Sequence, residues 1–323
     1  MIPGWARVVV SLALLAFLVW WLPVDRVWAA MQRIRPTQWL FGFVVLVVGQ
    51  GLAALKWAVL LRAAGAPVGF REIFRAHQAG LLSNIFLPSV IGGDVVRLGV
   101  LARRSSTETA VASGLADRVL DAGSMVLLPA AALVLGTGLA PESRGLTGRI
   151  VAALLGLAVL ALAAWLSFRW LSSYKHLPKR FSDWLSRFRG VFRTLLSRPG
   201  AAILAFGLSI VAQSLFVLVN AHLGVLMGIS IPLAGWFLAW PLAKLVAMVP
   251  VSLGGIGVRE GALAFFLMPL GVDPSLAVAE SFLWESMLIA QALLAGLLVL
   301  WLRPTARALS ADGNPPGDSD GGS

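Results

Sequence analysis

Long apolar runs recur along this chain, and they limit its fold more than any other feature. Of the 323 residues, 59% are hydrophobic and only 13% are charged, a balance far from that of a soluble domain. A helix needs about 20 mainly apolar residues to cross a bilayer, and a helix satisfies its own backbone hydrogen bonds in lipid. Six runs meet or approach that length and are expected to be transmembrane helices: residues 6–22, 38–61, 118–138, 150–171, 200–227 and 276–302.

Two further apolar regions, residues 71–101 and 232–270, are interrupted by proline and glycine. Proline removes a backbone donor and glycine lets the chain bend, so neither region is a simple span. We predict that each enters and leaves the membrane by the same face. The expected fold is an all-α integral membrane protein with about six spanning helices and two re-entrant broken-helix hairpins.

One motif occurs in both interrupted regions. The pattern P-x3-G-G-x2-V-R begins at Pro88 and again at Pro250, about half the chain apart. In the expected topology the two copies enter from opposite faces, which inverts the half-repeats, residues 38–171 and 200–302, relative to each other. Inverted repeats are typical of transporters, whose substrate sites lie near the bilayer midplane at discontinuous helices. We therefore predict a pseudo-symmetric inverted repeat within one transmembrane domain, residues 1–309.

A basic segment at residues 175–198 sets the expected orientation. Its excess of Lys and Arg places it in the cytoplasm. Its apolar side chains recur at helical spacing, which predicts an amphipathic helix on an anionic membrane surface, with a solvated linker as the alternative. Counting outward puts both termini in the cytoplasm of a bacterial or archaeal cell. Arg26, Arg33 and Arg35 run against this charge bias.

The two ends of the sequence carry separate expectations. Residues 6–22 follow Arg7 and precede a small-residue site, so a cleavable signal peptide is the alternative to a retained first span. Residues 310–323 consist of Gly, Pro, Ser and Asp with Ala and Asn, and we expect a disordered tail.

Composition makes several classes of function improbable. The chain has no cysteine and only three histidines, which are far apart in the sequence, so we expect no metal site and no cofactor. No glycine-rich phosphate-binding loop is present to hold ATP. The net charge of +11 is explained by cytoplasmic loops and anionic lipid, so we expect no nucleic-acid partner.

The repeated motif has the chemistry of an anion site. A helix that resumes after Gly93 or Gly255 presents unpaired N–H groups and the positive end of its dipole. Arg97 and Arg259 lie near those helix starts, and a guanidinium grips phosphate oxygens bidentately. The alternative for Arg97 is a helix end at the cytoplasmic surface.

A charge at membrane depth costs at least about 2.5 kcal/mol, so these arginines should be paired or face a polar cavity. Asp94 and Glu260 are the nearest acids in sequence. Further charged candidates for the site lie elsewhere in apolar sequence: Asp117, Arg118, Lys244, Glu280 and Glu285.

Asp117 and Asp121 are spaced to share one helix face. They can hold a cation or pair with arginine; the ordinary alternative is that they are helix-start acids that favour the dipole. We expect Lys56 to snorkel toward the cytoplasmic surface. The remaining polar residues are expected to make interhelical hydrogen bonds: His77, Gln213, Asn220 and His222.

Three blocks carry a family resemblance: "GLLSNIFLPSVIGGDVVRLGVLARR", "ASGLADRVLDAG" and "VPVSLGGIGVREGALAFFL". They resemble the transmembrane flippase domain of the lysylphosphatidylglycerol synthase family, over about residues 38–302. The resemblance implies a membrane protein that moves or handles a lipid, in the best-understood members an aminoacylated phosphatidylglycerol flipped to the outer leaflet. The residues that match the family blocks are Asn84, Pro88, Gly92, Gly93, Asp94, Arg97, Asp117, Arg118, Pro250, Gly254, Gly255, Gly257, Arg259 and Glu260.

The sequence departs from the family in two respects. No soluble aminoacyl-transferase domain follows Leu302, so we expect that this chain does not make aminoacyl-lipid and that its substrate need not be that lipid. The last span has Glu280 and Glu285 where such proteins often carry an arginine, which leaves the charge of the substrate open.

The leading hypothesis is a lipid translocase, not an enzyme. It would move a phospholipid or a lipid-linked anionic headgroup between leaflets, bound by the helix N-termini and arginines of the two motifs. A membrane phosphatase or glycosyltransferase is one alternative, and a non-transporting accessory protein of a glycolipid or cell-envelope lipid pathway is another. The expected partners are membrane lipid and an anionic membrane surface; a homo-oligomer and an envelope-biosynthesis partner stay open.

Overall fold

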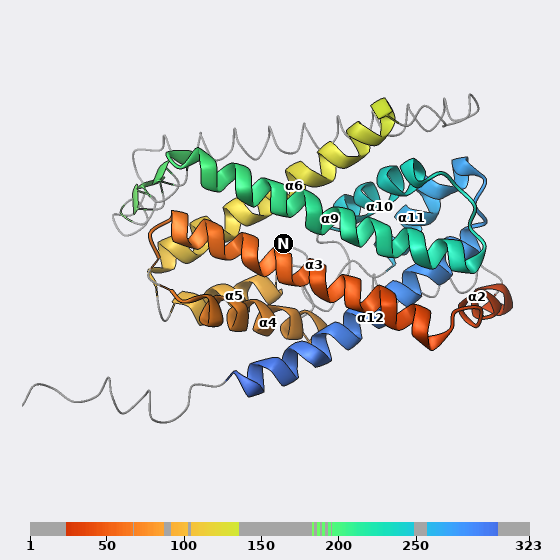
Figure 1. Ribbon diagram of the computed structural model, residues 1–323, viewed down its shortest axis with the longest axis horizontal. Helices are drawn as coiled ribbons and strands as arrows, with labels where there is room; N and C mark the ends of the chain where they lie inside the picture. Colours follow the sequence, from red (N-terminus) through yellow and green to blue (C-terminus); the bar gives the residue numbers. More distant parts are fainter. Residues whose placement is uncertain are drawn as a thin grey trace, which may run out of the picture.

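The computed structural model describes residues 24–66, 68–86, 92–102, 105–135, 196–248 and 257–302, together with residues 183, 186, 187, 189, 190, 193 and 194. Throughout these residues the chain is helical and contains no strand (Figure 1). The helices are α2 (Val24–Met31), α3 (Pro36–Ala63), α4 (Phe70–Phe86), α5 (Gly92–Ala102), α6 (Thr107–Leu135), α9 (Pro199–Met227), α10 (Leu233–Ala247), α11 (Val258–Leu267) and α12 (Pro274–Trp301), with a short 3-10 turn at Met268–Leu270.

Three helices, α3, α9 and α12, are long and apolar enough to cross a membrane. Their outward faces carry exposed apolar side chains, such as Phe41, Val48, Ile203, Val211 and Leu297. Such faces are unfavourable in water and favourable in lipid. The prediction of an all-α membrane protein is therefore confirmed.

These three helices match the spans predicted at residues 38–61, 200–227 and 276–302. Residues 6–22 and 150–171 lie outside the described residues, so the number of spans stays a prediction. The span expected at residues 118–138 is part of α6, which begins earlier, at Thr107.

The early start of α6 corrects one interpretation. Asp117 and Asp121 lie in the middle of this helix, well beyond its first turn. The dipole of a helix acts mainly within its first and last turns. The explanation of these two acids as helix-start residues is therefore wrong.

Both interrupted regions form pairs of helices. The first hairpin is α4 with α5, and the second hairpin is α10 with α11; the two helices of each pair pack on each other. In Figure 1 the first hairpin lies toward the left end of the long helices and the second toward the right end. They thus approach the middle of the bundle from opposite ends. Their entry from opposite faces of the membrane stays a prediction.

The second helix begins at a different position relative to the glycine pair in each hairpin. The second helix of the first hairpin begins at Gly92, within the glycine pair. The second helix of the second hairpin begins at Val258, not directly after Gly255, because Gly257 has a φ of +82°, a left-handed conformation that a helix cannot contain. Pro88, Pro250 and Gly254 lie outside the described residues, as does Gly255.

The halves of the chain interlock. Helix α4 of the first hairpin packs against α12, α10 of the second hairpin packs against α6, and α3 packs along α9. Each hairpin therefore packs against a long helix that belongs to the other half of the chain. This reciprocal arrangement is what an inverted repeat would produce, and it brings both hairpins to one central region.

The described residues of the basic segment at residues 175–198 are helical up to Leu196, and their side chains are exposed. Arg187 reaches Glu108 at the start of α6 across 3.4 Å. The apolar side chains of its predicted membrane face lie largely outside the described residues, as do residues 1–23 and 303–323. Its placement on a membrane surface stays a prediction.

Candidate functional site

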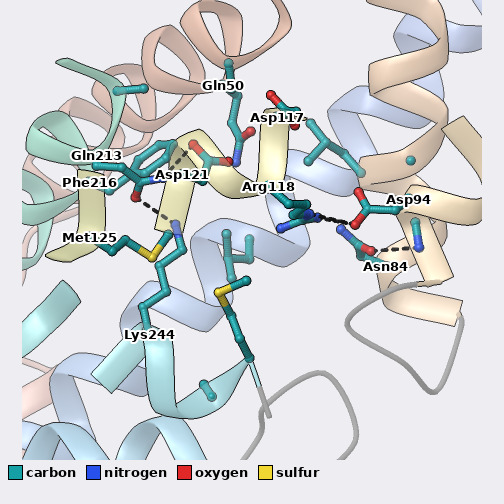
Figure 2. A pocket seen from close by; sticks show the side chains of 18 of the residues that line it. Gln50, Asn84, Asp94, Asp117, Arg118, Asp121, Met125, Gln213, Phe216 and Lys244 are labelled. Carbon is teal, nitrogen blue, oxygen red and sulfur yellow. Dashed lines mark hydrogen bonds and ion pairs between the residues drawn. The ribbon is translucent and has the colours of Figure 1, made fainter. Parts of the chain in front are cut away.

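A cavity of about 270 Å³ lies where the two hairpins meet the long helices (Figure 2). Residues from α3, α4, α5, α6, α9, α10, α11 and α12 line it. Its polar lining consists of Gln50, His77, Asn84, Asp94, Arg97, Asp117, Arg118, Asp121, Gln213, Lys244 and Arg259. The structure therefore brings the arginines of both sequence motifs to a single polar pocket.

On the first hairpin, α4 and α5 approach each other closely enough to require glycine. A Cβ atom on Gly80 would lie 2.8 Å from the carbonyl oxygen of Gly93. The side-chain oxygen of Asn84 accepts a hydrogen bond of 3.1 Å from the backbone N–H of Gly93 (Figure 2). This bond satisfies one of the unpaired donors at the start of α5, so the first helix tip is already partly occupied by the protein itself.

Arg97 is buried and forms ion pairs with two acids. Its Nε lies 3.0 Å from Asp94 and its Nη2 lies 2.8 Å from Asp117. Its guanidinium carbon also lies 4.7 Å from the centroid of the Trp57 ring, a cation–π distance. The alternative that Arg97 ends a helix at the cytoplasmic surface is therefore wrong.

Arg118 shares one of these acids. Its Nε donates to Asp94 across 2.8 Å. Its side chain is 38% exposed, whereas that of Arg97 is 7% exposed. Arg118 is thus the arginine of this cluster with an edge open to an incoming ligand.

Lys56 does not snorkel to the surface. Its Nζ lies 2.9 Å from Asp117 and 2.5 Å from Asp121, and its side chain is buried. Two carboxylates from α6 replace water around the ammonium group. Their negative charge offsets the energetic cost of burying this cation. The expectation for Lys56 is corrected because the sequence does not show that α6 lies beside α3 at this level.

Asp121 extends the network toward the second hairpin. It accepts a hydrogen bond of 2.6 Å from Ser209 and one of 3.4 Å from Gln213 on α9. Gln213 in turn accepts a bond of 2.9 Å from Nζ of Lys244 on α10. Figure 2 shows Asp121, Gln213 and Lys244 on one side of the pocket. Asn84, Asp94 and Arg118 lie on the other side.

Lys244 differs from the other cations of the cavity. Among the described residues, no carboxylate lies within ion-pair distance of it. Its Nζ lies 5.0 Å from the ring centroids of both Phe216 and Trp240, and Trp284 packs edge-on against Trp240. The ammonium group is therefore held by ring faces and one amide oxygen.

Arg259 has two acidic partners. Its Nη2 lies 2.8 Å from Glu260 and 2.6 Å from Glu285 of α12. The second oxygen of Glu260 accepts a hydrogen bond of 2.6 Å from the backbone N–H of Gly257. This carboxylate therefore caps the start of α11. Glu260 thus binds the N-terminus of α11, and Glu260 and Glu285 together pair with Arg259.

Of the residues predicted for the site, eight line the cavity: Asn84, Gly93, Asp94, Arg97, Asp117, Arg118, Lys244 and Arg259. Gly257, Glu260 and Glu285 support Arg259 without lining the cavity. Gly92 and Glu280 are described but are not in the lining. Glu280 is fully buried behind it.

Several lining residues were not among those predicted to contact the ligand. Asp121 was considered only as a partner of a cation or an arginine or as a helix-start acid, although the face that it shares with Asp117 was a signal for the site. His77, Gly80 and Asn84 also recur at helical spacing on α4. Gln50 and Gln213 each stand alone in an apolar run, and only the packing of the helices shows that they face the cavity.

The acids that line the cavity are paired with the protein's own cations. Among the residues that the structure describes, no group of three His, Asp or Glu side chains is placed to hold a metal ion. Asp94, Asp117 and Asp121 each have a cationic partner. A ligand in the cavity would therefore meet basic and neutral hydrogen-bond donors, such as Arg118, Lys244 and Gln50.

Comparison with known proteins decides the family. The model of the lysylphosphatidylglycerol synthase TM region matches residues 5–296, most of the chain. The chain belongs to this family. The resemblance noted from the motif blocks is thus confirmed, and the protein is an integral membrane member of the lysylphosphatidylglycerol synthase TM-region family.

Relatives of this family member include archaeal membrane proteins. A UPF0104 membrane protein of Methanothermobacter thermautotrophicus is 24% identical, over 86% of this chain and 89% of the relative. A UPF0104 membrane protein of Pyrococcus horikoshii is 22% identical, over 91% of this chain and 95% of the relative. No solved structure matches this chain.

Proposed function

We propose that this family member is a lipid translocase that moves a phospholipid, or another lipid with an anionic headgroup, between the leaflets of the cell membrane. The headgroup occupies the central cavity, and the acyl chains stay in the surrounding bilayer. Membership of a lysylphosphatidylglycerol synthase TM-region family supports a role with lipid. The cavity supports the charge and the size of the headgroup.

The observation that carries the proposal is the state of Lys244. Its amine lines the cavity and has no carboxylate partner among the described residues, whereas Arg97, Arg118 and Arg259 are all paired. A buried charge is stabilised when it is paired and destabilised when it is not. An anionic headgroup in the cavity would supply the missing partner of Lys244.

The size of the cavity limits what enters it. About 270 Å³ lies just below the usual range of small-molecule pockets, roughly 300–1,000 Å³. A phosphate with a small polar substituent fits such a volume, and a whole lipid does not. Arg118, with its exposed edge, and neutral groups such as Gln50 would contact the headgroup beside Lys244.

The two hairpins supply a route for access from either side. They lie toward opposite ends of the long helices (Figure 1), and both contribute residues to the cavity. Irregular backbone at membrane depth is tolerated where it borders a protein-lined cavity. Movement of one hairpin at a time would expose the cavity to one leaflet at a time. The Lys- and Arg-rich segment before α9 supports a cytoplasmic location for the α4–α5 side.

The function is tested in liposomes that contain purified protein and fluorescent lipids with anionic, zwitterionic or cationic headgroups. Wild-type protein should exchange the anionic lipid fastest. Lys244→Met keeps the length of the side chain and removes its charge, so exchange of the anionic lipid should fall about tenfold or more, the equivalent of one lost charge-assisted hydrogen bond.

Arg26→Gln is the matched control, because Arg26 is exposed and pairs with Asp273 far from the cavity. It should exchange lipid at the wild-type rate. The proposal fails if protein-free vesicles exchange lipid as fast as wild-type protein, or if Lys244→Met leaves the exchange of every headgroup unchanged.

A further inference from the structure

Glu280 is a buried acid with no role in the network around the cavity. It lies in α12 with 0% of its surface exposed. Trp284, one helical turn further along the same face, lines the cavity, and Glu285 pairs with Arg259. Glu280 therefore lies one helical turn from a residue that lines the cavity, without lining the cavity itself.

Neither carboxyl oxygen of Glu280 has a hydrogen-bond partner among the described residues. The charged groups that act on it are Arg259 and Glu260, both on α11. Arg259 cannot neutralise Glu280, because its guanidinium already contacts Glu260 and Glu285. A carboxylate this deeply buried and this poorly paired is disfavoured, so the group holds a proton.

Other helices add no counter-charge at this position. Besides α11, the helices that pack against α12 are α2, α3, α4 and α9 and, through Trp240, α10. Their titratable side chains are Asp25, Arg26, Lys56, Arg62, Arg71, Glu72, Arg75, His77, His222 and Lys244, none of which acts on Glu280. The nearest acid on its own helix is Glu285, which Arg259 holds.

The charge balance around Arg259 depends on this proton. With Glu280 neutral, Arg259, Glu260 and Glu285 together carry one excess negative charge. With Glu280 ionised, the group carries two. A headgroup phosphate in the cavity, which Arg259 also lines, brings a further negative charge close to this group, and the repulsion is smaller when Glu280 is neutral.

We propose that Glu280 is a proton-binding site whose occupancy is linked to binding of the anionic headgroup, so that a proton crosses the membrane with each lipid. This inference rests on the proposed translocase function, and it identifies the proton gradient as the force that drives lipid transport. The linkage is reciprocal: the protonated form favours the anion, and the anion favours protonation. Anion binding is therefore strongest at low pH and weakens as pH rises through the ionisation of Glu280.

The test uses liposomes with wild-type protein, a fluorescent anionic lipid and an imposed pH gradient, with the membrane potential clamped to zero. If one proton moves with each lipid, a gradient of one pH unit should drive about a tenfold difference in lipid between leaflets. Glu280→Gln mimics the protonated acid permanently. It should still exchange lipid without a gradient, but the gradient should no longer create an asymmetry.

Glu108→Gln is the control variant, because Glu108, at the start of α6, pairs with the exposed Arg187. It should respond to the gradient as the wild type does. Equal asymmetry in wild type and Glu280→Gln would overturn the inference, as would wild-type exchange that ignores the gradient. Absence of exchange from every protein would instead overturn the translocase function.

A spectroscopic measurement covers the case in which Glu280→Gln does not fold. Infrared spectra of the detergent-solubilised wild type should contain a neutral-carboxyl band that disappears at high pH. Glu280→Asp, which keeps the titratable group, should shift that band. A wild-type spectrum without the band, or a band that Glu280→Asp leaves unmoved, would show that Glu280 is not the proton site.

Discussion

The guanidinium of Arg97 donates to the carboxylate of Asp117 across 2.8 Å, and this buried bond joins the first hairpin to α6. Asp117 also contacts Lys56 on α3. A single carboxylate thus holds two cations from two other elements. The first hairpin is positioned by charge as well as by apolar packing, and removal of this acid should affect both stability and function.

We expect Asp117→Asn to lower the thermal stability of the purified protein. The substitution keeps the size of the side chain but leaves two buried cations short of negative charge, and breaking one partner of a buried pair costs about 3–5 kcal/mol. Thermal unfolding in detergent measures the loss. Arg26→Gln, which breaks the exposed pair with Asp273, should change stability by less than about 1 kcal/mol. Equal effects of the two variants would contradict this account of the network.

The contact between the two helices of the first hairpin makes a separate prediction. Gly80→Ala places a Cβ 2.8 Å from the carbonyl oxygen of Gly93, and overpacking of this kind costs about 1–3 kcal/mol. Gly99→Ala, also on the first hairpin, meets no atom within 4 Å and should be neutral or slightly stabilising, because alanine favours helix. The melting temperatures of the two variants should therefore differ. A Gly80→Ala protein as stable as Gly99→Ala would refute the close approach.

Gly257 before α11 should tolerate substitution poorly. Its φ of +82° strains any residue with a Cβ, at a cost of about 1–3 kcal/mol. Gly257→Ala should lower stability and slow lipid exchange, since the N–H of this residue binds the acid that also holds Arg259. Gly261→Ala lies within the helix in open space and is the control. Wild-type exchange by Gly257→Ala would show that this turn does not position the arginine.

The opposite approach of the two hairpins is testable in a chain that has no natural cysteine. Gly69 precedes the first hairpin and Ser230 precedes the second, and both are exposed. Gly69→Cys and Ser230→Cys should react with a membrane-impermeant thiol reagent from opposite sides of the membrane. Gly69→Cys should react from the cytoplasmic side. Reaction of both variants from one side would exclude hairpins that enter from opposite faces.

Access of water to the cavity is testable on a single helix. Gln50 lines the cavity, whereas Val48, two residues earlier on α3, is exposed on the outer, apolar face. A thiol reacts as the thiolate, which forms in water and not in lipid. Gln50→Cys should therefore react with a water-soluble reagent and Val48→Cys should not. The reverse order would mean that the cavity is dry or that α3 does not face lipid.

Much of the framework was predictable because its causes are local. Apolar runs long enough to cross a bilayer predicted α3, α9 and α12, and proline with glycine predicted the two broken regions. Those signals act within a few residues of chain, so the sequence contains them fully. The same blocks identified the family, which the match over residues 5–296 confirmed.

The predictions failed where a side chain's partner lies on another helix. Lys56 was expected at the surface, yet α6 places two carboxylates beside it. Glu280 was counted with the substrate-binding residues, yet it lies behind the cavity wall. In both cases the decisive quantity is the rotation of one helix against its neighbours, which no local pattern specifies.

The amino-acid sequence by itself determined that this chain is helical, lies in a membrane and breaks two of its helices, because hydrophobicity and backbone chemistry are properties of each short segment. Only the tertiary structure decided which charges are neutralised and which are left free. Arg97 and Arg259 became paired, while Lys244 has no acid partner among the residues that the structure describes. Electrostatic energy depends on distances of a few ångströms between separate helices, and those distances exist only in the packed bundle.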